Sequence, residues 1–230
     1  IIHRKLNEHF LSNGIDKKVY VLNFSIPDSV VFAEFITYLT FVHALKPNIV
    51  IAHDGFNDFH YGSRSDESIM NHANLIYQNC FEKWSELLAN SHVTSTSYDS
   101  PKKNTIPLVL KSYIERKQQW ENICKINKTK FIWGLQPAIF FKTELHPWEY
   151  TSIFKNNPQN LRNNNCTIES KSYRMMRKLK GLKIKNFIDF NKKLDFSNKE
   201  IDFFDNMHLT PHCDDKVAQV YTEYIINNLK

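Results

Sequence analysis

The chain has 230 residues, of which 42% are hydrophobic, 13% aromatic and 23% charged, and its formal net charge is +6. This composition is typical of one folded domain and excludes disorder along the whole length. No apolar run reaches the roughly 18 residues that a membrane-spanning helix needs, because Glu34 and His43 interrupt the longest one.

The N-terminal part of the chain alternates between predicted strands and helices. Residues 18–24 (KVYVLNF) alternate in polarity and are rich in β-formers, which predicts a strand. The turn that follows predicts a helix N-cap at Ser29, and apolar side chains at helical spacing predict a helix over 31–46. The wholly apolar run 48–52 (NIVIA) predicts a buried strand of a parallel sheet.

The same alternation continues toward the C-terminus. A long irregular segment is predicted over 144–165, where Asn and Pro are frequent. Alternating strands and helices predict a single α/β domain over 1–230, a three-layer α/β/α sandwich whose active site lies beyond the carboxyl ends of its strands. The other predicted elements are helices over 69–88, 106–126, 173–180 and 212–229 and strands over 130–136 and 184–189.

A first group of polar residues, 53–58 (HDGFND), directly follows the NIVIA run. Gly55 permits a tight turn that would bring the amide of Asn57 to the mouth of the sheet. A neutral amide donor there can stabilise a developing oxyanion without titrating. The alternative is an Asx-type turn, in which Asn57 and Asp58 cap the reversal of the chain.

A second group, Asp205 to His208 (DNMH), lies just before the last predicted helix. A carboxylate three residues before an imidazole can fold back and accept the Nδ1 proton, which leaves Nε2 to act as a base. The alternative is a turn at the start of the helix with a surface histidine, because D-x-x-H often arises by chance.

Taken together and in this order, the two groups resemble the G-x-N-D and D-x-x-H motifs of the SGNH (GDSL-type) hydrolase family of esterases and lipases. The flanks KPNIVIAHDGFND and FFDNMHLTPHCDDKVAQVY are also similar to the usual surroundings of those motifs. The resemblance extends over nearly the whole chain from Lys18 and is less characteristic between about Asn90 and Asn165. It implies a flavodoxin-like parallel sheet and a serine esterase that needs no cofactor and no metal ion.

The resemblance also implies a role for individual residues. His208 would be the general base, Asp205 its orienting partner, and Asn57 a side-chain donor to the oxyanion hole. The family has a second donor, the backbone N–H of a glycine, and Asp28 stands about where that glycine is expected. The N–H survives the exchange to aspartate, but a carboxylate beside a forming oxyanion would oppose it.

The nucleophile of the family, the serine of its G-D-S segment, has no match in the chain, because none of the five glycines precedes Asp-Ser. The run 18–24 corresponds to the second strand of the family, so we expect the serine to lie upstream of Ile1. Loss of a central strand is disfavoured because it would leave unpaired sheet edges. Ser25 and Ser29 match the oxyanion segment, and a cap role for Ser29 is favoured over a nucleophilic one.

Three functions follow from these patterns. The first is hydrolysis of an acyl ester, with an acetyl group and a carbohydrate alcohol as the specific candidates; Trp148 and Tyr150 would wall the cleft or pack in the core. The second is an inactive binding module that kept the fold. The third is a metal-dependent hydrolase, which the divergence of adjacent side chains on a strand argues against. Its ligands by residue type would be His53, Asp54, Asp58, His60, His208 and His212.

The expected partner is a small-molecule or carbohydrate ester, with no membrane span and no nucleic acid. Seven basic residues fall within 171–185, and we interpret them as a solvated helix face because no nucleic-acid motif or aromatic interleaving accompanies them. Four cysteines far apart in sequence predict free thiols rather than a zinc knuckle or a disulfide scaffold. They are Cys80, Cys124, Cys166 and Cys213.

Overall fold

The computed structural model describes residues 1–62, 106–142, 144–154, 176–179, 184–196 and 199–228. The chain divides into two compact units, each assembled from separated stretches of sequence. Unit 1 comprises Ile1–Phe24, Gln136–Leu161 and Asp189–Lys230, and unit 2 comprises Ser25–Leu135 and Arg162–Ile188. The predicted helix over 69–88 lies outside the described residues.

The described residues of unit 2 are built on a sheet of three strands in the order β1-β2-β3. Strand β1 (Ile49–Asp54) pairs in parallel with β2 (Lys130–Leu135), and β3 (Phe187–Asp189) follows on the far side of β2, crossing the unit boundary at its last residue. The register runs from Ile49↔Lys130 to Asp54↔Leu135. All three strands were predicted, but β1 extends two residues further, so that Asp54 ends the strand, and β3 comprises only the last three residues of the predicted run 184–189.

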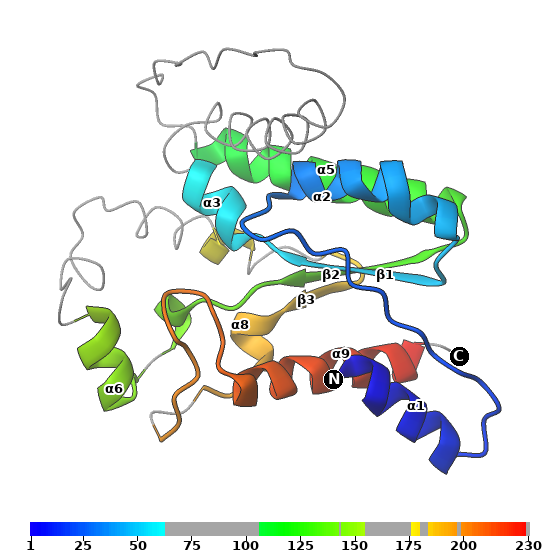
Figure 1. The fold of residues 1–230 in the computed structure, drawn as a ribbon. Coiled ribbons are helices and arrows are strands. Elements are labelled where there is room, and N and C mark those ends of the chain that lie inside the picture. The colour runs from blue at the N-terminus through cyan, green and yellow to red at the C-terminus, as the bar shows by residue number, and fades with distance from the viewer. Residues whose placement is uncertain (63–105, 143, 155–175, 180–183, 197–198, 229–230) are drawn as a thin grey trace, which may run out of the picture. The chain divides into compact units, whose positions relative to one another are not determined.

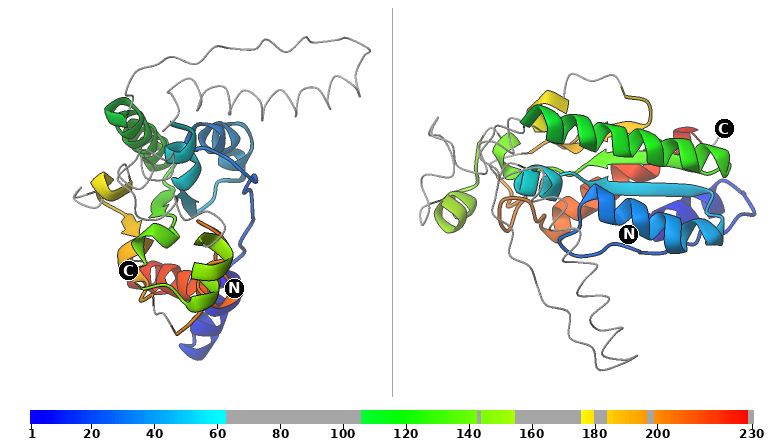
Figure 2. Two further views of the ribbon diagram at one scale, coloured as in Figure 1. Left: turned by 90° about the vertical axis from the view of Figure 1, so that its left-hand side faces the viewer. Right: turned by 90° about the horizontal axis from the view of Figure 1, so that it is seen from above.

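Two helices lie along one face of this sheet (Figures 1 and 2). Helix α2 (Val31–Thr37) continues through a π-helical turn, η1 (Tyr38–Val42), and a 3₁₀ turn, η2 (His43–Leu45). Helix α5 (Ile106–Ile126) has the predicted bounds and returns the chain to β2, as a parallel pair of strands requires. The predicted α/β class, a parallel sheet with flanking helices, is thereby confirmed, while the three-layer arrangement stays a prediction.

The core of unit 2 is aromatic and centres on Trp120, which is 4% exposed. Its ring lies 5.1 Å from that of Phe131 on β2 and 5.7 Å from that of Tyr38 on η1. Along α5, Val109, Tyr113, Trp120 and Cys124 are all buried, at the spacing of one helical face. Cys124 is a free buried thiol, as is Cys213 in unit 1, which confirms the prediction for both. The other two cysteines lie outside the described residues.

Unit 1 is mainly helical. Helix α1 (Ile2–Ser12) packs against α9 (Pro211–Asn228), and Lys5 Nζ donates to Gln219 Oε1 at 3.0 Å. The prediction of an irregular segment is wrong over 147–154, where the chain is helical. Pro147 and Glu149 start this helical stretch, and Glu149 completes a capping box. The shorter elements are η3 (Ile139–Phe141), α6 (Pro147–Glu149), η4 (Tyr150–Phe154) and α8 (Phe190–Lys193).

The strand predicted over 18–24 is wrong: the segment is irregular. Its apolar side chains face solvent, with Tyr20 71% and Leu22 66% exposed. The side-chain amide of Asn7 accepts from the backbone N–H of Val19 at 2.8 Å and donates to its carbonyl at 3.0 Å. These bonds replace the hydrogen bonds that a neighbouring strand would make. An alternating sequence does not by itself provide such a neighbouring strand.

The basic cluster is described at three positions. Arg177 and Lys178 are exposed on the helical residues 176–179, where Met176 and Leu179 are buried, and Lys185 is exposed as well. This agrees with the predicted solvated face at these positions. Within the described part of the chain, none of the helices is long and apolar enough to span a membrane.

The turn after β1 has space for glycine alone. Gly55 adopts φ +116°, and a Cβ atom there would lie 2.8 Å from Leu135 Cδ1 and 2.9 Å from Tyr113 Oη. We predict that Gly55→Ala lowers the free energy of unfolding by about 2–5 kcal/mol, through backbone strain and overpacking. Urea unfolding measures this cost. Gly14→Ala is the matched control, because Gly14 has φ +64° and nothing within 4 Å of the added atom, and it should cost only about 1 kcal/mol. Equal costs would contradict the steric argument.

Candidate active site

The Asp205–His208 segment is the tip of a short closed loop in unit 1, which we call the histidine loop (203–209). Phe203 and Leu209 form an antiparallel bridge at its base. Above the bridge, the N–H of Phe204 donates to the carbonyl of His208 at 2.8 Å. The side chains of Phe203 and Leu209 pack with Ile139 in an apolar cluster, so the loop is anchored by packing as well as by backbone bonds.

At the tip, the imidazole and the carboxylate lie in direct contact. His208 Nδ1 lies 2.6 Å from Asp205 Oδ2, and Asp205 Oδ1 accepts the backbone N–H of Met207 at 2.9 Å and of His208 at 2.8 Å. Partial burial would raise the pKa of Asp205, but the hydrogen bonds from His208 and from the two N–H groups outweigh it and lower that pKa. The side chains remain 52% and 62% exposed for Asp205 and His208, so a substrate can reach the ring.

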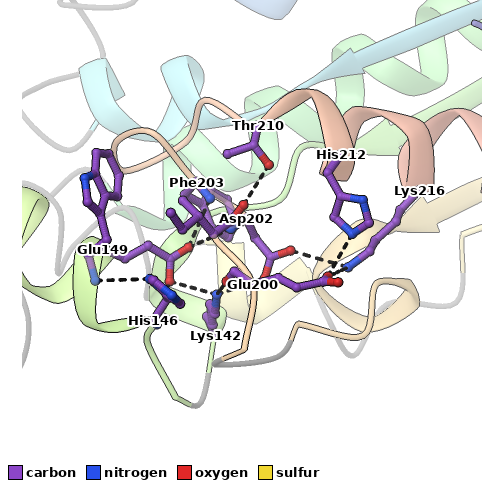
Figure 3. Close-up of polar contacts among 11 residues, drawn as sticks. Lys142, His146, Glu149, Glu200, Asp202, Phe203, Thr210, His212 and Lys216 are labelled. Carbon is purple, nitrogen blue, oxygen red and sulfur yellow. Dashed lines mark hydrogen bonds and ion pairs between the residues drawn. The ribbon is translucent and has the colours of Figure 1, made fainter.

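The histidine loop is tied to two further segments of unit 1. The N–H of Ile139 donates to the carbonyl of Asn206 at 3.0 Å. Below the loop, a buried ionic cluster joins Lys142 to Glu149 and Asp202 (Figure 3). The sequence interpretation missed this cluster. The proline and glutamate of HPWE signal the start of α6, but nothing local indicates that Glu149 reaches residues some fifty positions away.

The second candidate group, in unit 2, is held by a different set of bonds. Helix α3 (Phe56–Gly62) begins directly after Gly55, and Asn57 Nδ2 donates to the carbonyl of Ser29 at 3.0 Å. Both carboxylate oxygens of Asp58 accept the N–H of Val31, at 3.0 and 3.2 Å. The two side chains thus bind the first residue of α2 and the segment before it, instead of closing an Asx-type turn of their own.

These bonds correct the predicted helix cap. The N-cap residue of α2 is Val30, without a side-chain cap, and the Ser29 hydroxyl lies 3.4 Å from the carbonyl of Val30. The start of α2 is buried against α3, so the carboxylate of Asp58 satisfies the N–H of Val31 in place of a local serine.

Asp28 has the backbone conformation of a glycine position. Its φ is 61°, in the left-handed region that favours glycine and that aspartate tolerates better than most residues. The residue is exposed. Through its neighbour Ser29, the backbone of this turn is bonded to Asn57. The structure therefore brings together the two candidate oxyanion donors within unit 2, and Asp205 with His208 within unit 1.

A buried ion pair fixes the end of β1. Lys117 is paired with Asp54, whose other oxygen accepts the hydroxyl of Tyr113 at 2.7 Å. The ammonium also lies 5.2 Å from the ring centre of Trp120 and 5.8 Å from that of Trp133. Burial would raise the pKa of Asp54, but the charge of Lys117 and its hydrogen bonds lower it. The turn that carries Gly55 and Asn57 therefore starts from a fixed residue, Asp54.

Three of the six ligands considered for a metal-dependent hydrolase are bound to other groups. Asp54 is paired with Lys117, Asp58 binds the N–H of Val31, and His212 Nε2 lies 2.8 Å from Glu200 Oε2. Among the residues that the structure describes, no three His, Cys, Asp or Glu side chains converge in a way that could hold a metal ion.

Comparison with known proteins finds similarity to solved structures. No family model matches the sequence, and no curated protein matches it. A presumed acylhydrolase from Bacteroides fragilis is similar at 17% identity and a TM-score of 0.46, covering 100% of this chain and 82% of the other. A GDSL-like lipase from Bacteroides thetaiotaomicron is similar at 17% identity and a TM-score of 0.45, covering 98% and 82%. Similarities at this identity and TM-score assign no role to any residue of this chain.

The burial of Asp58 predicts a pH-dependent stability. Burial and the charge of Asp54 raise the pKa of Asp58 to about 7. An acid with a raised folded-state pKa stabilises the fold at low pH, and this contribution is lost as the pH rises toward 7. We therefore expect the free energy of unfolding to fall between pH 5 and pH 7. Asp58→Asn should flatten this fall by at most about 2–3 kcal/mol, at about 1.4 kcal/mol per pH unit.

Chemical denaturation at several pH values measures the two slopes. Asn keeps an oxygen that can accept the N–H of Val31 but cannot release a proton in this range. The matched control is Asp195→Asn, at an exposed position of unit 1, which should leave the slope of the wild type unchanged. If Asp58→Asn has the same slope as the wild type, Asp58 does not titrate in this window.

Proposed function

We propose that this protein is a serine ester hydrolase in which Asp205 and His208 form the acid–base pair. The observation that carries the proposal is the 2.6 Å contact between Asp205 Oδ2 and His208 Nδ1. An ionised carboxylate at Nδ1 keeps the proton on that nitrogen and presents a lone pair at Nε2, which is the tautomer that a general base requires. The lowered pKa of Asp205 keeps it ionised at neutral pH.

In the proposed mechanism, His208 Nε2 takes the proton of a serine hydroxyl while the serine oxygen attacks the ester carbonyl. The side chain of Asn57 and the backbone N–H of Asp28 donate to the oxyanion that forms. One hydrogen of the Asn57 amide is used on Ser29, and an amide nitrogen carries two. The alcohol leaves with the proton from Nε2, and water then releases the acid by the same route. The serine itself is to be identified by experiment.

For the substrate we propose a short acyl ester, in the first instance an acetyl ester on a carbohydrate. Trp148 and Tyr150 are 41% and 58% exposed, and they flank Glu149, whose carboxylate binds the start of the histidine loop. Their exposed aromatic faces would provide apolar contacts for such a substrate. A panel of acetylated sugars and of aryl esters with short and long acyl chains tests this part of the proposal.

The acid–base pair is tested by a matched set of histidine and aspartate variants. We predict that His208→Ala abolishes hydrolysis of an aryl acetate above background, and that Asp205→Asn lowers kcat by about 10³–10⁴-fold with a much smaller change in KM. His212→Ala is the control: His212 lies in the same unit, is 55% exposed and is also bonded to a carboxylate, and its loss should leave kcat unchanged. Equal activity of His208→Ala and the wild type would overturn the proposal.

A fluorophosphonate probe complements the kinetics. We expect it to label a single serine of the native protein, with labelling slowed in His208→Ala, and peptide mass spectrometry then identifies the nucleophile. If the protein neither reacts with the probe nor hydrolyses any ester of the panel, the serine esterase is refuted and the inactive binding module is favoured.

The oxyanion donors are tested separately. We predict that Asn57→Ala lowers kcat by about 10²–10³-fold, because a preorganised donor to the transition state is lost. Asn48→Ala, at an exposed position just before β1, is the control and should not change kcat. Asp28→Gly keeps the backbone N–H and removes the carboxylate, so kcat should rise severalfold. A fall in kcat for Asp28→Gly would show that this segment is wrongly assigned.

A further inference from the structure

The ionic cluster below the histidine loop consists of Lys142, Glu149 and Asp202, which we call the buried triad. Lys142 Nζ lies 2.7 Å from Glu149 Oε2 and 2.8 Å from Asp202 Oδ2, and all three side chains are 0% exposed. Lys142 Nζ also donates to the carbonyl of Glu200 at 3.0 Å. Figure 3 shows the triad between the segment of α6 and the chain that leads into the loop.

Glu149 uses its two oxygens for different tasks. Oε2 accepts from Lys142 and from the N–H of His146, at 2.9 Å for the latter. Oε1 accepts the backbone N–H of Asp202 at 2.9 Å and of Phe203 at 3.0 Å. One oxygen therefore holds the carboxylate in place, and the other holds the two residues that begin the histidine loop.

A short path of bonds leads from Glu149 to the imidazole. Glu149 fixes the N–H of Phe203, the next residue Phe204 donates to the carbonyl of His208, and Asp205 follows in the chain. The other end of the loop is fixed where the N–H of Thr210 donates to the carbonyl of Asp202 at 2.9 Å. Both ends of the loop thus meet at residues that Glu149 binds.

Stability alone does not explain this arrangement. Burial of charged groups is costly, and apolar side chains of similar volume often stabilise a fold equally well or better. An apolar residue could not accept the N–H groups of Asp202 and Phe203. The excess negative charge of the triad is offset by Lys216, whose Nζ lies 3.4 Å from Asp202 Oδ1. The cluster provides a fixed acceptor at the start of the loop, which a core of leucines would lack.

We propose that Glu149, held in place by Lys142, is a positioning residue for His208. It sets the separation of Asp205 and His208 before a substrate binds, by fixing the backbone from which both side chains extend. This inference rests on the proposed role of His208 as the base. It adds to that role a part for the HPWE segment, which contains no group of the acid–base pair.

The test combines kinetics with a direct view of the imidazole. In protein labelled with ¹⁵N-histidine, the His208 Nδ1–H resonance is assigned by its absence from His208→Ala. We expect Glu149→Gln to broaden or shift this resonance and to lower kcat by about 10–100-fold while KM changes little. The amide of glutamine presents hydrogens toward Lys142 and the N–H of His146, so it can no longer be held as the carboxylate is.

Two controls separate positioning from stability. Glu200→Gln alters an exposed carboxylate that binds His212 and Lys216 at the edge of the cluster, and it should change neither the resonance nor kcat. Ile225→Ala removes buried volume from α9 in the same unit, so it should lower Tm while leaving the imidazole signal intact. If Glu149→Gln lowers Tm as Ile225→Ala does, but leaves the His208 signal and kcat unchanged, the positioning role is overturned.

The charge-balanced double variant Lys142→Met/Glu149→Gln is measured if Glu149→Gln does not fold. It removes one charge of each sign and leaves Asp202 paired with Lys216. The same change of the His208 signal is expected, and an unchanged signal would refute the inference. Absence of ester turnover in the wild type would defeat the proposed function, yet the resonance would still decide whether Glu149 positions His208.

Discussion

An unpaired charge in a protein interior is costly, and in each unit one lysine neutralises a buried carboxylate at the base of a candidate functional segment. Lys117 neutralises Asp54, the last residue of β1, and the turn carrying Asn57 begins at the next residue. Lys142 neutralises Glu149, whose other oxygen holds the start of the histidine loop. Removing either lysine would leave a charge stranded in an apolar interior. The candidate functional groups thus extend from backbone that these ion pairs hold in place.

Elements specified by local pattern could be predicted from the sequence, and elements that need a distant partner could not. Helix α5 follows the spacing of its own apolar residues, and its bounds were predicted correctly. The run 18–24 has an equally clear strand pattern, but a strand exists only where a neighbour completes its hydrogen bonds, and there Asn7 binds Val19 instead. The prediction of Ser29 as the cap of α2 was wrong for the same reason, because the N–H of Val31 is bound by Asp58, 27 residues away.

The same distinction between local and distant partners applies to the candidate site. The contact of Asp205 with His208 spans three residues, so the D-x-x-H pattern was enough to predict it. Nothing near Lys142 or Glu149 in the sequence distinguishes them from surface residues, because lysine and glutamate are exposed in most folds. Their burial follows from bonds to residues 202 and 203, more than fifty positions further along the chain. Such partners are recognised only after the chain has folded.

The division of the chain into interleaved stretches has a consequence for how the protein is made. In unit 1, Lys5 on α1 is bonded to Gln219 on α9, 214 residues away, and the histidine loop is held by Glu149 across 54. Contacts over such distances form late and slowly, because a long loop must close before they are gained. Helix α1 leaves the ribosome long before α9, so the apolar face of α1 has no partner to pack against until α9 has been synthesised. Unit 1 therefore completes its fold only after synthesis has passed α9, and until then its apolar faces stay exposed and prone to aggregation.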